Sequence, residues 1–289
     1  MIIVTDRACD LSPSQLVGLK VHFTPMRLTL DGKTYSSGED LSSEQFYEIL
    51  AHTDGLPVTS QATPGDFAEI YRRLAQTDPE ILSIHISSNL SGTIQSATIG
   101  AEMVPEARVT IWDSRTLSCP LAWQVEAAGL AINAGWPLER ILAVLERVRS
   151  AAEGLFTLDT LKYLIHGGRI GHLKGLLASV LHIRPIIGIT KDTGIYYTLA
   201  QERTMKRALQ KVAESLLRFF PEGSDLRAQL LNGYNPQALA DLQVEVEKLF
   251  KCHWLPTISV GPILGAHTGP SVVGLCAAPF ELFGELSLK

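Results

Sequence analysis

Residues 81–104 have the sequence ILSIHISSNLSGTIQSATIGAEMV, in which an apolar run, a polar loop and an amphipathic segment follow one another. The run 81–86 is dominated by isoleucine and leucine and predicts a buried strand. In 94–104 the apolar residues recur at the spacing of one helical face, which predicts a helix. Strand, loop and helix in this order form the repeating unit of a parallel α/β sheet.

Hydroxyl-bearing residues gather in the loop 87–93, SSNLSGT, directly before that helix. A second cluster, 59–64 (TSQATP), precedes a helix for which Thr63 is the expected N-cap and Pro64 the first residue. The first turn of a helix leaves backbone N–H groups unpaired and carries partial positive charge, so an anion gains hydrogen bonds there. Serine and threonine also cap helices without any ligand. Two such clusters in neighbouring βα units favour an anion site.

The composition excludes several classes of protein. Hydrophobic residues make up 46% and charged residues 19% of the 289 residues, a balance typical of folded globular chains. The formal net charge of −5 argues against the basic surface that nucleic acids require, so we expect no nucleic-acid partner. Neither a basic leader nor an apolar run of membrane-spanning length occurs, which predicts a cytoplasmic protein with no membrane span.

The chain also lacks the usual signatures of metal and nucleotide sites. Its four cysteines are scattered without a C-x-x-C pair, and its eight histidines do not occur at the i, i+4 spacing of a helical metal site. Neither a G-x-x-x-x-G-K-[ST] loop nor a G-x-G-x-x-G fingerprint is present. We therefore expect no metal, no cofactor and no ATP site in this chain.

The order of the expected elements predicts two α/β domains. Strands and helices alternate up to residue 149, which predicts an N-terminal parallel-sheet domain over 1–154, with an antiparallel hairpin at Asp31–Gly32. The alternation is less strict in 155–289, which predicts a mixed sheet there. Beyond residue 104 the expected strands are 108–112, 155–158, 185–190, 195–199, 227–231, 257–260 and 272–277, and the expected helices are 121–134, 138–149, 160–165, 173–181, 204–219 and 236–250.

Four strings occur in an order that resembles the DegV family of bacterial fatty-acid-binding proteins. They are LPVTSQ at 56–61, SSNLSGTIQSA at 87–97, DTLKYLIHGGRI at 159–170 and GAHTGP at 265–270. The resemblance covers nearly the whole chain. Two departures stand out, because the family usually has Asp-Ser-Thr-Ala-Asp-Leu where this chain has Arg7, Ala8 and Cys9 between its aspartates, and His-Thr-Gly-Pro-Gly where it has Ser271.

The resemblance implies that the first domain holds one long-chain fatty acid, of about C14 to C18, in an apolar tunnel. It implies that Thr59 and Ser91 hydrogen-bond the carboxylate, and that Arg169 and His267 lie on the head-group side. It further implies a separate ATP-dependent kinase partner that converts the bound acid to an acyl phosphate.

The physics of an anion site adds three neighbours to this set. The hydroxyl of Ser60 and the helix-start positions Gly92 and Thr93 are expected to complete the shell of donors around the carboxylate.

A hydrolase is the alternative from another class, with Ser91 as nucleophile and His267 as base, acting on acyl esters or acyl phosphates. Against it, Ser91 stands in Leu-Ser-Gly-Thr and not in the G-x-S-x-G turn that exposes a nucleophilic serine, and no acid to orient the histidine is evident. A regulator whose contact surface changes with lipid occupancy is a third possibility that the sequence leaves open.

Overall fold

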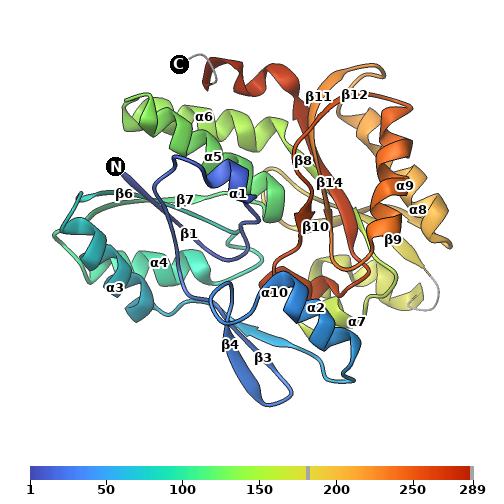
Figure 1. Ribbon diagram of the computed structural model, residues 1–289, viewed down its shortest axis with the longest axis horizontal. Helices are drawn as coiled ribbons and strands as arrows, with labels where there is room; N and C mark the ends of the chain where they lie inside the picture. The colour runs from blue at the N-terminus through green and yellow to red at the C-terminus, as the bar shows by residue number, and fades with distance from the viewer. Residues whose placement is uncertain (180–182, 287–289) are drawn as a thin grey trace.

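A computed structural model describes residues 1–179 and 183–286 of the chain. In this part of the chain the strands form three sheets. A parallel sheet from the first half and a larger mixed sheet from the second half lie side by side, and a small antiparallel sheet lies at one end of their junction (Figure 1). The structure is therefore α/β, as predicted, with a parallel N-terminal sheet and a mixed C-terminal one.

The parallel sheet has the strand order β2-β1-β6-β7. Its strands are β1 (Ile2–Thr5), β2 (Val21–Phe23), β6 (Glu80–His85) and β7 (Arg108–Asp113), and its helices are α1 (Pro13–Leu16), α3 (Pro64–Ala75), α4 (Thr93–Glu102), α5 (Ser118–Asn133) and α6 (Leu138–Ala151). Ile2 and Val4 pack with α3 and α4, whereas Ile3 belongs to the core under α5. Side chains that alternate in this way require helices on both faces, which is why Ile2, Ile3 and Val4 of β1 are all apolar.

The mixed sheet has the order β10-β9-β8-β14-β11-β12, and β13 also pairs with β11. The strands are β8 (Glu153–Thr157), β9 (Arg184–Ile189), β10 (Tyr196–Glu202), β11 (Asp225–Asn232), β12 (Lys251–Trp254), β13 (Ile258–Ser259) and β14 (Val273–Pro279). Helices α8 (Met205–Ser215) and α9 (Pro236–Glu247), with the short 3-10 helix η2 (Leu216–Arg218), cover one face of this sheet (Figure 1). Residues of the other face, among them Cys276 and Ala278, belong to the core that includes α5.

The small antiparallel sheet has the order β4-β3-β5, with β3 (Arg27–Leu30), β4 (Lys33–Ser36) and β5 (Val58–Ser60). Asp31 and Gly32 have φ of 51° and 75°, so the predicted hairpin is confirmed. Strand β5 was not predicted, because its three residues are held by pairing with β3, which is distant in sequence. Helices α2 (Ser43–Ala51) and α10 (Pro262–Thr268) pack beside this sheet (Figure 1).

Several helix predictions differ from the structure in type or in bounds, among them those over 173–181 and 121–134. The helix predicted over 173–181 is wrong within the described residues: 169–179 form the 3-10 helix η1 (Arg169–Ser179), which follows α7 (Lys162–His166) and is kinked at Leu173, and residues 180 and 181 lie outside the described ranges. Helix α5 begins at Ser118, three residues before the predicted start, because Pro120 lies in the first turn, where its missing N–H costs no hydrogen bond.

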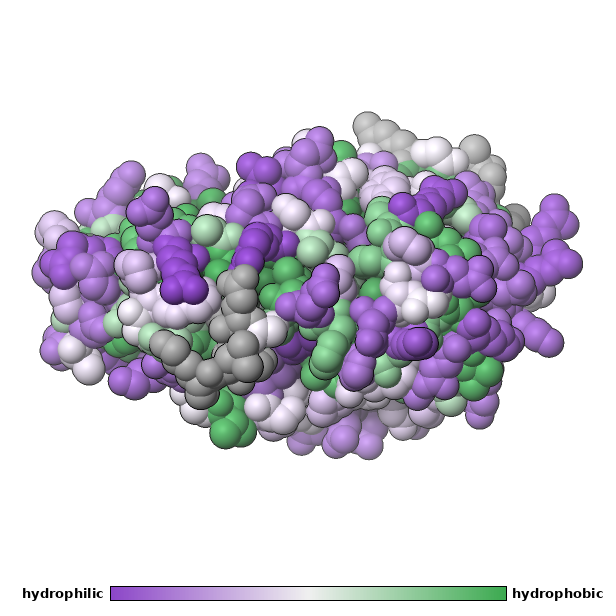
Figure 2. Space-filling model, turned by 90° about the horizontal axis from the view of Figure 1, so that it is seen from above, coloured by the Kyte–Doolittle hydropathy of each residue, from purple (hydrophilic) through white to green (hydrophobic). Residues whose placement is uncertain are grey.

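Hydrophilic side chains cover most of the upper face of the molecule, and hydrophobic atoms are visible between them in small areas (Figure 2). Within 1–179 and 183–286, none of the helices combines the length and the apolar character that a bilayer crossing requires. The 3-10 helix η3 (Phe280–Leu286) ends the described chain.

The packing of α3 on α4 depends on Gly100, and this yields a stability prediction. A Cβ at Gly100 would lie 2.5 Å from the Cβ of Phe67 and 2.8 Å from the carbonyl oxygen of Pro64. The helix propensity gained by Gly100→Ala is about 1 kcal/mol, but overpacking a close helix contact costs about 1–3 kcal/mol. The two atoms that the Cβ would meet cannot move without the backbone, so the cost is at the upper end of this range. We therefore expect Gly100→Ala to lower the free energy of unfolding by about 1–2 kcal/mol in urea denaturation.

Gly171→Ala is the matched control, because nothing lies within 4 Å of the position of its Cβ. It should change the unfolding free energy by less than about 0.5 kcal/mol. A Gly100→Ala variant as stable as wild type would contradict the prediction.

Candidate functional site

A cavity of about 300 Å³ lies where the small sheet, the loop before α4 and helix α10 meet. It is lined by Met26, Thr59, Ser60, Gln61, Ile86, Leu90, Ser91, Arg169, Tyr196, Ile263, Leu264 and His267. Five of the seven residues predicted for the site are in this lining, although they come from four separate segments. The other two, Gly92 and Thr93, are not part of it. We call this space the head cavity.

Thr59 and His267 are joined across the head cavity. Thr59 lies on β5 opposite Leu28 of β3, and its Oγ1 is 2.8 Å from Nε2 of His267, which is in the last turn of α10. His267 is 9% exposed. Burial, with Arg169 and His166 nearby, lowers the pKa of His267 to about 4, so its imidazole is neutral at pH 7.

The second ring nitrogen of His267 decides how this hydrogen bond is oriented. Nδ1 is buried, and in the part of the chain that the structure describes no acceptor or donor lies within hydrogen-bond reach of it. It faces Gly167, where a Cβ would collide with it. A proton on Nδ1 would be unsatisfied, so the neutral ring carries its proton on Nε2 and donates to Thr59. The hydroxyl proton of Thr59 is then available to another acceptor.

Arg169 joins the two sides of the head cavity. Its Nη1 donates to the carbonyl oxygen of Gly167 at 2.6 Å, and its Nε donates to that of Leu90 at 3.3 Å. Leu90 belongs to the loop that carries Ser91, so the guanidinium ties the second half of the chain to this loop. The guanidinium also supplies positive charge at the cavity wall, since arginine stays protonated.

Ser91 is held by two neighbours. Its Oγ is 2.8 Å from Oγ1 of Thr93 and 3.4 Å from Oε1 of Gln61. The side chain of Gln61 donates in turn to Ser96 at 3.0 Å and lies against Gly92, where a Cβ would be 2.6 Å from its Nε2. Thr93 is fully buried, so it supports Ser91 from behind. The missing side chain of Gly92 makes room for Gln61.

Gln61 was not predicted as a site residue, although it ends the quoted string Leu-Pro-Val-Thr-Ser-Gln. The start of α3 also differs from the expected anion seat. Thr63 and Asp66 form a capping box there, in which the Asp66 carboxylate accepts from the Thr63 N–H at 2.8 Å. Capping therefore explains the hydroxyls at α3, whereas Gly92 caps α4 without a side-chain hydrogen bond.

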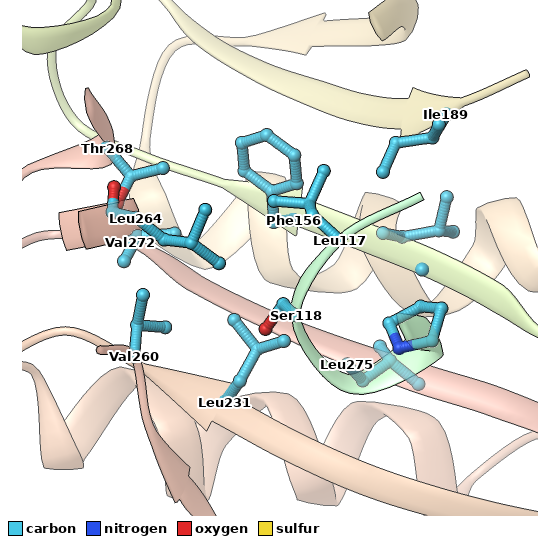
Figure 3. A pocket seen from close by; sticks show the side chains of 13 residues that line it. Leu117, Ser118, Phe156, Ile189, Leu231, Val260, Leu264, Thr268, Val272 and Leu275 are labelled. Carbon is cyan, nitrogen blue, oxygen red and sulfur yellow. The ribbon is translucent and has the colours of Figure 1, made fainter. Parts of the chain in front are cut away.

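A second, apolar cavity of about 40 Å³ lies between the mixed sheet, the start of α5 and helix α10 (Figure 3). It is lined by Leu117, Ser118, Pro120, Gly154, Leu155, Phe156, Ile189, Leu231, Val260, Leu264, Thr268, Val272 and Leu275. We call it the tail cavity. Leu264 lines both cavities, and Tyr196 of the head cavity packs edge-on against Phe156 of the tail cavity with ring centroids 5.7 Å apart.

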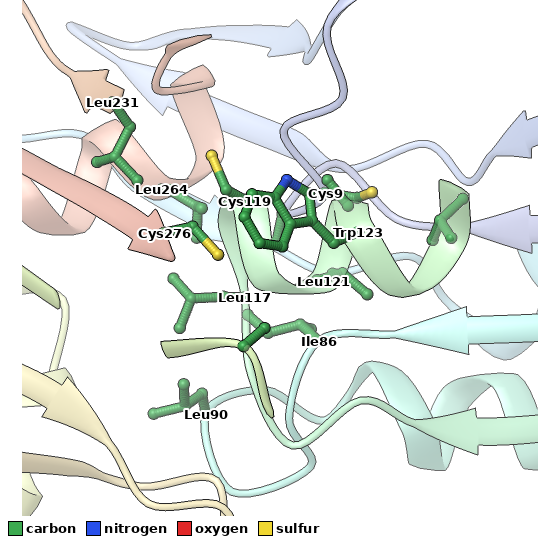
Figure 4. Close-up of a cluster of buried hydrophobic side chains, with 14 of the residues drawn as sticks. Cys9, Ile86, Leu90, Leu117, Cys119, Leu121, Trp123, Leu231, Leu264 and Cys276 are labelled. Atoms are coloured by element: carbon green, nitrogen blue, oxygen red, sulfur yellow. The ribbon is translucent and has the colours of Figure 1, made fainter. Parts of the chain in front are cut away.

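One hydrophobic cluster contributes to the walls of both cavities. Ile86 and Leu90 of the head cavity and Leu117, Leu231 and Leu264 of the tail cavity all belong to it (Figure 4). Apolar side chains therefore adjoin both the polar groups around Ser91 and the tail cavity.

The geometry does not support the hydrolase alternative. Nε2 of His267 bonds to Thr59, and Ser91 bonds to Thr93 and Gln61, so the described contacts contain no hydrogen bond that joins Ser91 to His267. A serine nucleophile needs a base within hydrogen-bond reach of its hydroxyl.

Known proteins resemble this chain over almost its whole length. A family model described as "Uncharacterised protein, DegV family" matches residues 1–279. A DegV domain-containing protein of Deinococcus radiodurans is 32% identical over 280 residues, which cover 96% of this chain and 95% of the relative.

Solved structures agree with this match. A fatty-acid-binding DegV family protein from Thermus thermophilus superposes with a TM-score of 0.87 at 30% identity, covering 96% of this chain and 99% of the other. The fatty-acid-binding protein DegV of Bacillus subtilis superposes with a TM-score of 0.83 at 26% identity, covering 96% and 98%. On these matches, together with the four strings that line or support the head cavity, the chain belongs to the DegV family.

Proposed function

We propose that this protein binds one long-chain fatty acid, with the carboxylate in the head cavity and the acyl chain in the tail cavity beside the mixed sheet. The observation that carries the proposal is that the two cavities adjoin, with Leu264 in the wall of both. Polar donors line one end of this space and hydrocarbon lines the other, which is the distribution of polarity in a fatty acid. The fatty-acid-binding proteins from Thermus thermophilus and Bacillus subtilis support the same ligand class.

The head cavity offers three kinds of donor to a carboxylate. Thr59 has a hydroxyl proton to donate because His267 supplies the other proton of that contact. The hydroxyl of Ser91 can turn from Gln61 toward a charged acceptor, and Arg169 contributes positive charge. A carboxylate that leaves water without such partners would pay several kcal/mol or take up a proton.

The acyl chain supplies most of the affinity in this proposal. Burial contributes about 0.8 kcal/mol per methylene, so about sixteen carbons gain on the order of 10 kcal/mol before entropic losses. The tail cavity of about 40 Å³ is far smaller than the roughly 300–1,000 Å³ of usual ligand pockets. The lining side chains must therefore move to admit the chain, and they come from both halves of the protein, 1–154 and 155–289.

Presentation to a separate kinase completes the proposal, with the bound carboxylate phosphorylated by that partner. Ser60 at the rim of the head cavity is exposed, so a partner can approach the head group from this side. The kinase itself is inferred from the family resemblance alone. The preferred chain, about C14 to C18, has the same basis.

The first prediction concerns the two hydroxyls. In delipidated protein, Thr59→Val and Ser91→Ala should each weaken palmitate binding by about 1–3 kcal/mol, because each removes a hydrogen bond to a buried charge. Displacement of a fluorescent fatty acid measures the affinity.

Ser88→Ala is the matched control for both variants, since the hydroxyl of Ser88 bonds to Asp113 at 2.6 Å and does not line the head cavity. It should bind palmitate as wild type does. A Thr59→Val/Ser91→Ala double variant with unchanged affinity would refute the proposed carboxylate site.

The second prediction tests the neutral state of His267. Because the pKa of His267 is lowered from 6.5 to about 4, the imidazole binds a proton between these pH values in the unfolded chain but not in the folded protein. The contribution of neutral His267 to the free energy of unfolding is fully present above pH 6.5 and is lost as the pH falls toward 4. Between pH 7.5 and 5, delipidated wild type should therefore lose about 2 kcal/mol more unfolding free energy than His267→Gln.

Urea denaturation of both proteins at the two pH values measures this difference. Glutamine can still donate from its Nε2 to Thr59, so the comparison removes the titration and keeps a donor. Equal losses in the two proteins would contradict the prediction, because they would show that folding does not lower the pKa of His267.

A further inference from the structure

Asp10 is a buried carboxylate that touches neither the head cavity nor the tail cavity. It lies in the loop between β1 and α1 and is 8% exposed. Its Oδ2 accepts from the hydroxyl of Ser118 at 2.6 Å, and its Oδ1 accepts from the N–H of Gly261 at 3.0 Å. These partners are 108 and 251 residues away in sequence. One side chain therefore joins three distant segments.

The two partners of Asp10 begin two segments that line the tail cavity. Ser118 lines it between Leu117 and Pro120 at the start of α5 (Figure 3). Gly261 is the N-cap of α10, whose Leu264 lines both cavities. The separation of these two segments therefore contributes to the width of the tail cavity.

The backbone conformation of Ser118 is constrained by the neighbouring loop. Its φ is 52°, in the left-handed region that serine rarely adopts. Its N–H donates to the carbonyl oxygen of Ala8 at 2.7 Å, so the loop that carries Asp10 holds both the backbone and the hydroxyl of Ser118. Such a conformation persists only where the surroundings impose it.

Burial makes the charged form of the Asp10 carboxylate energetically unfavourable. Burial raises the pKa of Asp10 to about 6, although the bonds from Ser118 and Gly261 oppose this shift and the nearby Asp6 adds to it. An asparagine could make both contacts without a buried charge, by accepting from Gly261 and donating to Ser118. What the position requires for the geometry is thus a side chain with two hydrogen-bonding atoms.

We infer that Asp10 is a specificity-determining residue of the fatty-acid site: it ties the start of α5 to the start of α10 and so limits the width of the acyl-chain space. The inference rests on the proposed function. In the tied state the space favours a straight, saturated chain. Without the tie the walls separate more easily, so a bent, cis-unsaturated chain gains relative to a saturated one and both are released faster.

Delipidated full-length Asp10→Ala and Asp10→Asn test this inference with palmitate and oleate. In Asp10→Ala the ratio of oleate affinity to palmitate affinity should rise about fivefold, since about 1 kcal/mol of hydrogen bonding no longer opposes widening. Asp10→Asn should keep the wild-type ratio. Hydrogen–deuterium exchange of the ligand-free proteins should speed up in 118–121 and in α10 for Asp10→Ala alone.

Tyr71→Phe is the matched control for a lost buried hydrogen bond. Tyr71 bonds to Ser83 at 2.7 Å within the core under α3 and lines neither cavity. It should lower stability without changing the ratio of affinities or the exchange of α10.

Each of the following outcomes would refute one part of the argument: the tie through Asp10, its basis in hydrogen bonds, or the proposed function. An Asp10→Ala protein with the wild-type ratio, or with unchanged exchange in both segments, would refute the tie while fatty-acid binding stood. An Asp10→Asn protein that shifts as far as Asp10→Ala would refute the hydrogen-bond basis. Wild type that takes up neither lipid would refute the proposed function itself.

Discussion

Helix α5 is the element on which the rest of the structure depends, because it is buried between two sheets. Twelve of its 16 residues are buried, and its apolar side chains contact the core on all sides. A helix that is apolar all round is stable only when protein surrounds it. Trp123 of α5 also donates to Gln229 of the mixed sheet at 2.7 Å. The two halves thus share one core, and a cavity between them is lined by both.

The head cavity follows from the same arrangement, since two of its polar contacts form only when the halves meet. His267 and Arg169 come from the second half, and their partners Thr59 and Leu90 come from the first. Gly167 contacts both residues of the second half: its carbonyl oxygen accepts from Arg169, and its missing Cβ leaves room for the ring of His267. Separating the halves would expose or orphan each of these groups, which is a reason for the join to be rigid at this end.

The sequence predicts those parts of the fold and the candidate site that depend on local chemistry. Capping at Thr63, the turn at Asp31 and the βα unit around Ser91 are encoded within a few residues, and all three are found. Strand β5 and the contacts of Gln61 depend on pairing between distant segments, so no local pattern indicates them. Of the five predicted site residues that line the head cavity, Thr59, Ser91, Arg169 and His267 were predicted from the family resemblance, and Ser60 as a neighbouring hydroxyl. Their separation in the chain gives no local signal that they meet. Their contact with a carboxylate remains a proposal.

The two cavities differ in volume, and this difference bears on how a lipid would enter. The head cavity is already open at about 300 Å³, whereas the tail cavity holds about 40 Å³. In the proposed function the preformed head cavity would accept the carboxylate with little rearrangement. The acyl chain would have to displace packed side chains, and a densely packed core yields by discrete rearrangements and not by gradual deformation. Leu264 stands at the boundary and belongs to α10, the helix that also carries His267. Any movement of α10 that widens the tail cavity therefore also moves His267, which donates to Thr59, so in the proposed function uptake of the chain and recognition of the carboxylate would be coupled.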